Sequence, residues 1–176
     1  MTMKSGFLRR RGLSLAVLAI LALAALPAAS AGAAAASNAG GQIAADRDYV
    51  AAVERIRAED YVTAIALLEK AAERLPGSAE VFNYLGYTYR KVGREAAALA
   101  AYQRALFLAP NERSTRAELG TLYLERGEIG RAEEQLAEID RLCFFSCREY
   151  RTLKARIDDF KKLEATLPGK GQAPVN

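Results

Sequence analysis

The sequence of 176 residues contains no histidine, no tryptophan and only two cysteines. Without histidine the commonest general base is missing, as are the Ser-His and Cys-His pairs of nucleophilic catalysis. Two sulfurs without an imidazole leave a zinc site short of soft ligands. A phosphate-binding loop and a paired-glycine nucleotide motif are also missing. We therefore expect a protein that is not an enzyme and that holds no cofactor or metal ion.

Excess positive charge is confined to the amino terminus. The formal net charge is +4, but every charged residue before Asp46 is basic, namely Lys4, Arg9, Arg10 and Arg11. Removing these four from the 25 basic residues leaves 21, against 21 acidic residues. Because no basic stripe then remains to neutralise phosphates, we expect no nucleic-acid partner.

Residues 1–31 have the layout of a secretory signal peptide. A basic start precedes the apolar run from Leu13 to Leu26, and Ala29-Ser30-Ala31 offers the small side chains of a cleavage site. The twin arginines also match a twin-arginine export signal weakly. We therefore predict a periplasmic or secreted protein, with residues 32–44 as a flexible linker. The alternative is an uncleaved membrane anchor, although the apolar run is shorter than the roughly 20 residues that a span needs.

The rest of the chain repeats itself with a period of 34 residues. An apolar share dominated by alanine and leucine favours helices over strands. Such self-similarity is typical of stacked helical arrays. The matching positions are Ala64, Ala98 and Ala132; Leu68, Tyr102 and Leu136; Pro76 and Pro110; Leu85 and Leu119; Gly86 and Gly120; Tyr89 and Tyr123; Gly93 and Gly127; and Ala71 and Ala105.

The middle copy resembles the tetratricopeptide repeat. It has a spaced aromatic, leucine, glycine and tyrosine, then alanine, a second aromatic, alanine and proline, at Phe82, Leu85, Gly86, Tyr89, Ala98, Tyr102, Ala105 and Pro110. The family has Trp at the first aromatic position and Phe at the second. The first copy departs most, with Ala51-Ala52 and Arg55 in place of Leu-Gly and Tyr. The resemblance covers residues 45–144, in copies at 45–78, 79–112 and 113–146, and implies an all-α, right-handed α-solenoid of three helix pairs.

Apolar spacing and turn residues predict six helices, at 45–58, 61–74, 79–91, 95–108, 113–125 and 129–142. Gly86 and Ala98 lack bulk where paired helices cross, Gly93 suits a left-handed turn, and Pro110 ends a helix. A seventh helix at 147–165, opened by a capping box from Ser146 to Glu149, is predicted to cap the stack. Residues 166–176 are predicted to be a disordered tail.

The resemblance implies a concave groove lined by the first helix of each pair, which binds a protein or peptide partner. Its predicted lining is Tyr49, Val53, Arg57, Asn83, Tyr87, Arg90, Lys91, Ala117, Thr121 and Leu124. The alternative interpretation is that Tyr87 is only a half-buried packing residue and that Asn83 is only solvated. In one subset of the family, Lys and Asn side chains clamp the terminal carboxylate of chaperone tails. This clamp is missing here, and Glu118 at one of the corresponding positions would repel a carboxylate.

Cys143 and Cys147 lie between the third copy and the seventh helix, in the segment Cys-Phe-Phe-Ser-Cys. In an oxidising compartment we predict a disulfide that fixes this helix. The alternative is thiol chemistry, although redox motifs of the thioredoxin type use two intervening residues instead of three.

These observations favour an exported scaffold that binds another polypeptide and assists the assembly of an envelope complex. The alternative is an accessory thiol-redox or maturation factor that acts through the two cysteines. Because three repeats make a shallow groove, pairing of two copies through an exposed end is a third possibility. Membrane contact is expected only through an uncleaved amino-terminal segment.

Overall fold

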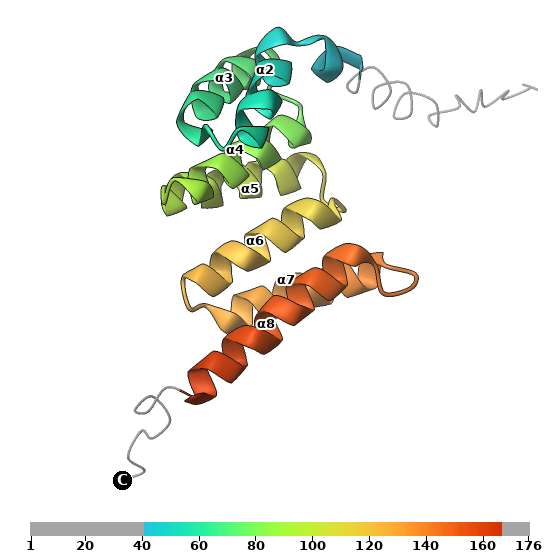
Figure 1. Cartoon of the computed structure of the whole chain (residues 1–176). Helices are drawn as coiled ribbons and strands as arrows, with labels where there is room; N and C mark the ends of the chain where they lie inside the picture. The colour runs from blue at the N-terminus through green and yellow to red at the C-terminus, as the bar shows by residue number, and fades with distance from the viewer. Residues whose placement is uncertain (1–40, 167–176) are drawn as a thin grey trace, which may run out of the picture.

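The computed structural model describes residues 41–166, within which a short helical segment at 41–45 and the seven helices α2 to α8 follow one another without strands (Figure 1). The helices are α2 (Arg47–Arg57), α3 (Tyr61–Arg74), α4 (Ala79–Lys91), α5 (Glu95–Leu108), α6 (Arg113–Glu125), α7 (Ile129–Leu142) and α8 (Arg148–Thr166). Five of these have the predicted bounds, whereas α2 is shorter at both ends and α8 begins and ends one residue later. The all-α fold is confirmed. The predicted signal peptide lies outside the described residues, as does all of the predicted tail after Thr166.

Helical structure is present earlier in the chain than predicted. Residues 41–45 are helical, and Ile43 is 7% exposed in the same core cluster as Tyr49. The prediction of a flexible linker over residues 32–44 is therefore wrong for residues 41–44, and residues 32–40 lie outside the described part of the chain. The prediction gave weight to Gly40 and Gly41 and overlooked an apolar side chain that can be buried.

Consecutive helices pack in pairs, α2 with α3, α4 with α5 and α6 with α7, and α8 packs on both α6 and α7. Figure 1 shows the pairs stacked one after another, with α8 at the carboxyl end of the stack. The amino-terminal core cluster includes Ala52, Leu68, Val81 and Leu85, and the carboxyl-terminal one includes Tyr102, Leu122, Ile139 and Leu153. Tyr89 packs against both clusters, so the two halves share one continuous core.

Three turns within the helix pairs place a residue at positive φ with the same period of 34. Gly93 has φ 74° and Gly127 has φ 73°, as expected for glycine in a left-handed turn. The equivalent residue of the first pair is Glu59, with φ 58°. The first repeat therefore keeps the backbone of the turn without the residue that suits it.

The crossing of α4 with α5 differs in detail from the prediction. A β-carbon at Gly86 would lie 2.5 to 2.8 Å from ring atoms of Tyr102, so it is an aromatic ring that fills the space. At the equivalent Gly120 a β-carbon would lie 2.6 Å from the Leu153 side chain of α8. The lack of a side chain at Gly120 thus allows α8 to pack closely on α6.

The capping box predicted at the start of α8 does not form. The carbonyl oxygen of Cys147 accepts the first helical bond, from Arg151 N at 3.1 Å, so the helix starts one residue later than predicted. The Ser146 carbonyl oxygen instead accepts from the Arg151 guanidinium at 2.6 Å. Because Ser146 lies outside the capping position, its hydroxyl is out of register with Glu149.

None of the helices within residues 41–166 is long and apolar enough to cross a membrane.

Candidate functional site

The first helix of each pair and α8 form one surface along the array, here called the first-helix face. Along it α4 contacts α6, and α6 contacts α8. The edge of the Tyr49 ring on α2 meets Tyr84 on α4, with ring centroids 5.9 Å apart. Seven of the ten predicted lining residues carry a polar group, and all seven lie on α2, α4 and α6, namely Tyr49, Arg57, Asn83, Tyr87, Arg90, Lys91 and Thr121.

Two of these residues are buried. Tyr49 is 8% exposed, and its hydroxyl donates to Glu80 Oε1 at 2.5 Å. Burial and the neighbouring Glu80 carboxylate together raise the pKa of Tyr49. Thr121 is 6% exposed and its hydroxyl donates to the Ala117 carbonyl oxygen at 2.9 Å. The Tyr49 hydroxyl thus ties α2 to α4, whereas the Thr121 hydroxyl is satisfied within its own helix.

Arg90 joins neighbouring first helices. Its guanidinium lies 2.7 Å from Glu118 and 2.6 Å from Glu125, both on α6, and the side chain is only 10% exposed. A largely buried cation with two carboxylate partners stabilises the stacking of α4 on α6 and is not free for a ligand. Arg57, by contrast, is exposed and pairs with Glu54 of its own helix.

An aromatic and cationic cluster lies at the carboxyl end of α4. The edge of the Tyr87 ring meets Tyr61 at a centroid distance of 6.0 Å, and the Lys91 ammonium lies 5.3 Å from the Tyr61 centroid and 6.0 Å from that of Tyr87. Within residues 41–166 Lys91 has no carboxylate at ion-pair distance. The sequence did not predict Tyr61 as part of the groove, because Tyr61 belongs to α3, the second helix of its pair. The turn after α2 brings the start of α3 beside α4, and an alignment of the repeats does not show this contact.

Asn83 lies beside a cavity between the starts of α4 and α6. Its Oδ1 atom is buried and has no hydrogen-bond partner. The cavity has a volume of about 230 Å³ and is lined by Ala79, Glu80, Asn83, Tyr84, Glu112 and Ser114. An unpartnered amide oxygen at a cavity wall can accept a hydrogen bond from a bound group.

A more apolar cavity of about 360 Å³ lies between the later turns of α6 and α8. Its lining is Thr121, Leu124, Glu125, Arg156, Asp159, Phe160 and Leu163. The prediction treated α8 only as a cap, yet this helix supplies most of the lining. The helical spacing of Leu153, Ile157 and Phe160 was the available signal that one face of α8 packs inwards.

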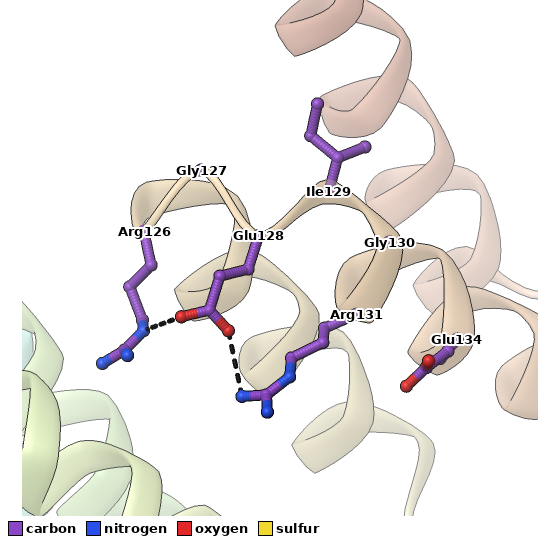
Figure 2. Close-up of a pocket in the computed structure, with 7 residues that line it drawn as sticks. All are labelled: Arg126, Gly127, Glu128, Ile129, Gly130, Arg131 and Glu134. Carbon is purple, nitrogen blue, oxygen red and sulfur yellow. Dashed lines mark hydrogen bonds and ion pairs between the residues drawn. The ribbon is translucent and has the colours of Figure 1, made fainter.

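An open depression of about 830 Å³ lies at the turn between α6 and α7 (Figure 2). All its lining residues come from the single segment 126–134. Figure 2 shows the Glu128 carboxylate bonded to Arg126 and Arg131, at 2.7 and 3.0 Å. The bond from Arg126 is the main cause of the lowered pKa of Glu128. Because its charged groups satisfy one another within one turn, we do not assign a site there.

Cys143 and Cys147 are bonded to each other in the structure, with Cα atoms 5.8 Å apart. Both pack against the carboxyl-terminal core cluster. The bond thus ties the end of α7 to the start of α8, as the sequence predicted. Among the described residues no group of three or more His, Cys, Asp and Glu side chains is placed to hold a metal ion.

Comparison with protein families identifies the middle helix pair. Residues 79–112, which span α4, α5 and the turn after them, match the family model described as Tetratricopeptide repeat. The middle helix pair is a tetratricopeptide repeat. The comparison with curated proteins gave no match.

Solved tetratricopeptide-repeat structures share this architecture. The type III secretion translocator chaperone SycD of Yersinia enterocolitica aligns with a TM-score of 0.61 at 15% identity, over 68% of this chain and 85% of that one. SycD in complex with a peptide of the translocator YopD gives 0.58 at 18%, over 66% and 88%. The second such domain of human RPAP3, in complex with an HSP70 peptide, gives 0.58 at 15%, over 63% and 92%. At these identities the likeness establishes the fold.

Proposed function

We propose that this protein is an exported adaptor that binds a segment of another polypeptide on the first-helix face and assists the assembly of an envelope complex. Two of the structurally similar proteins, SycD and RPAP3, have been solved with bound peptides. The observation that carries the proposal is the cluster of Tyr87, Tyr61 and Lys91 at the carboxyl end of α4. It combines aromatic surface with a cation that has no carboxylate partner in the described part of the chain.

The chemistry of this face suits a peptide with an acidic side chain near an apolar one. Lys91 offers an ammonium to a carboxylate, and the Tyr87 ring offers apolar area with few rotatable bonds. The cavity between α6 and α8 accepts an apolar side chain beside Leu124 and Phe160. Asn83 Oδ1 accepts from a backbone N–H of the ligand, which removes an unsatisfied buried atom.

The groove is tested by capture of partners from a native envelope extract. The tagged full chain is compared with Tyr87→Ala, Lys91→Ala and Asn83→Ala, and with Phe107→Ala as the matched control, because Phe107 is 75% exposed on the second helix α5. We expect Tyr87→Ala to weaken binding by about tenfold or more, since buried aromatic anchors dominate such interfaces. Equal capture by all four variants and the wild type would reject the groove.

Export is the second part of the proposal, and it rests on residues 1–31. Amino-terminal sequencing of the protein recovered from the periplasm or medium should find a start at Gly32 if Ala29-Ser30-Ala31 is cut. A protein that keeps Met1 and sediments with membranes would instead be anchored. Recovery in the cytoplasm alone would refute export.

The alternative, a thiol-redox or maturation factor, predicts that Cys143 and Cys147 cycle between thiol and disulfide. The adaptor proposal predicts a permanent bridge, because both cysteines pack on the core at a helix junction. Alkylation of the exported protein, with and without reductant, separates the two. Thiols that are labelled before reduction would favour the redox role.

A further inference from the structure

The loop between α7 and α8 presents two adjacent phenylalanines to solvent. Phe144 is 93% exposed and Phe145 is 82% exposed, the highest values among the large apolar side chains of residues 41–166. Their rings meet edge to face with centroids 5.0 Å apart. Figure 1 shows the loop standing out from the side of the array. We call Phe144 and Phe145 the loop tip.

The base of the loop is held firmly. Cys143 and Cys147 close it through their bond and pack on the core. The Arg151 guanidinium donates to the Ser146 carbonyl oxygen at 2.6 Å. A loop fixed in this way keeps its apolar groups outward and loses little conformational freedom when they bind.

The size of the loop tip decides between two kinds of partner. Two aromatic side chains supply roughly 150 to 250 Å² each. A stable protein interface needs about 800 Å² from each partner, with a shaped apolar centre. Along the chain, the exposed neighbours of the tip are polar, and Leu142, Cys143 and Cys147 are only partly exposed. A lipid bilayer needs no shape complementarity and accepts a small apolar wedge.

We propose that the loop tip inserts Phe144 and Phe145 into the interface of a lipid bilayer, and so orients the array on a membrane surface. The contact is a second attachment, because two aromatic side chains bind a bilayer only marginally without another signal. The proposal does not depend on the groove.

Charge around the loop tip indicates apolar insertion and not attraction to anionic lipid. Residues 138–151 carry three arginines and three carboxylates, so the segment is formally neutral. Arg141 lies 2.6 Å from Glu138, and Arg148 lies 3.8 Å from Glu149. Vesicle binding through the tip should therefore be similar on zwitterionic and anionic lipid.

The start of the described part of the chain is compatible with this orientation. In Figure 1 the helical segment before α2 and the α7–α8 loop both lie towards the right-hand side of the array. The apolar run that ends at Leu26 is 15 residues before residue 41, and a chain of that length reaches at most about 50 Å. If the run is retained as an anchor, it and the loop tip can reach the same bilayer.

The absence of tryptophan from the whole sequence makes a local test available. Phe144→Trp gives the full chain a single tryptophan at the loop tip, and Phe107→Trp gives the matched control at another exposed site, on α5. Each is mixed with phosphatidylcholine vesicles, with and without phosphatidylglycerol, and with lipids brominated on their acyl chains. We expect Phe144→Trp emission to shift to shorter wavelength and to be quenched by bromine on both kinds of vesicle, with Phe107→Trp unchanged.

A second variant removes the support of the loop. Adding Cys143→Ser and Cys147→Ser to Phe144→Trp should reduce the quenching at equal lipid, because the tip is no longer held outward. The proposal is overturned if Phe144→Trp emission does not respond, responds no more than Phe107→Trp, or responds only to anionic vesicles. A shift produced by a lipid-free envelope extract, without a shift on vesicles, would also overturn it in favour of a protein partner.

Discussion

At the scale of single residues, Glu59 is the clearest mismatch between sequence and backbone. It adopts φ 58° at the position that glycine occupies, at Gly93 and Gly127, in the next two turns. A side chain in the left-handed region costs about 1 to 2 kcal/mol, whereas glycine loses roughly 0.5 to 1 kcal/mol more entropy on folding. The cost of holding the Glu59 backbone in the left-handed region thus slightly exceeds the additional entropy that a glycine there would lose on folding.

Glu59→Gly should therefore raise the free energy of unfolding by up to about 1 kcal/mol. Denaturant unfolding, followed by helical circular dichroism, measures the change. Gly93→Ala is the matched control at the equivalent turn, where open space surrounds the residue and only the backbone is strained, so it should lower stability. A Glu59→Gly protein that is less stable than the wild type would contradict the equivalence of the turns.

Asp46 predicts a specific response to acid. Arg74 donates to both its oxygens, at 2.8 and 2.9 Å, and this pairing lowers the pKa of Asp46 from 3.8 to about 2. Because the folded pKa lies below the unfolded one, the contribution to stability is full above about pH 4 and is lost as the pH falls towards 2. Asp46→Asn keeps an oxygen to cap α2 but removes the charge.

The difference in unfolding midpoint between the wild type and Asp46→Asn should thus be largest near neutral pH and shrink between pH 4 and 2. Thermal unfolding across that range measures it. Asp159→Asn, which removes a carboxylate that is 75% exposed, is the control and should change the midpoint less. A difference that does not change with pH would rule out the ion pair as its source.

At the scale of helices, the junction of α6 with α8 depends on Gly120. A β-carbon there would meet the fully buried Leu153 at 2.6 Å. We expect Gly120→Ala to lower the free energy of unfolding by about 1 to 3 kcal/mol through overpacking. It should also speed tryptic cleavage within α8, because that helix is displaced.

Gly130→Ala supplies the control for this substitution. It lies near the start of α7 with nothing within 4 Å of a β-carbon, so alanine should be neutral or stabilise the helix by up to about 1 kcal/mol. If Gly120→Ala behaves like Gly130→Ala, the packing of α8 on α6 is not as described.

The sequence was sufficient for the helix bounds from Tyr61 to Leu142, because proline and glycine mark the turns between these helices. It was insufficient where a tertiary contact decides the local structure. Ile43 orders residues that look like a linker, and Cys147 takes the capping position expected of Ser146. The side of α8 that lines the cavity with α6 was not predicted, because α8 was treated only as a cap on the end of the array.

At the scale of the whole molecule, the repeat register placed the first-helix face correctly but not the exposure of each side chain. Exposure depends on neighbouring helices. Glu80 engages Tyr49, and two α6 carboxylates occupy Arg90. Lys91 remains accessible because the nearest groups are rings and not carboxylates. The set of residues that we propose to face the ligand thus contracts to Asn83, Tyr87 and Lys91, together with Tyr61.

Photo-crosslinking in the native envelope tests the central claim that the first-helix face binds another polypeptide. A photoreactive residue is placed at Tyr87, and separately at Phe107 on α5, in the full chain. The account predicts a discrete protein adduct from position 87, weakened by Lys91→Ala, and none from position 107. No adduct at position 87, or the same adducts from both positions, would contradict it.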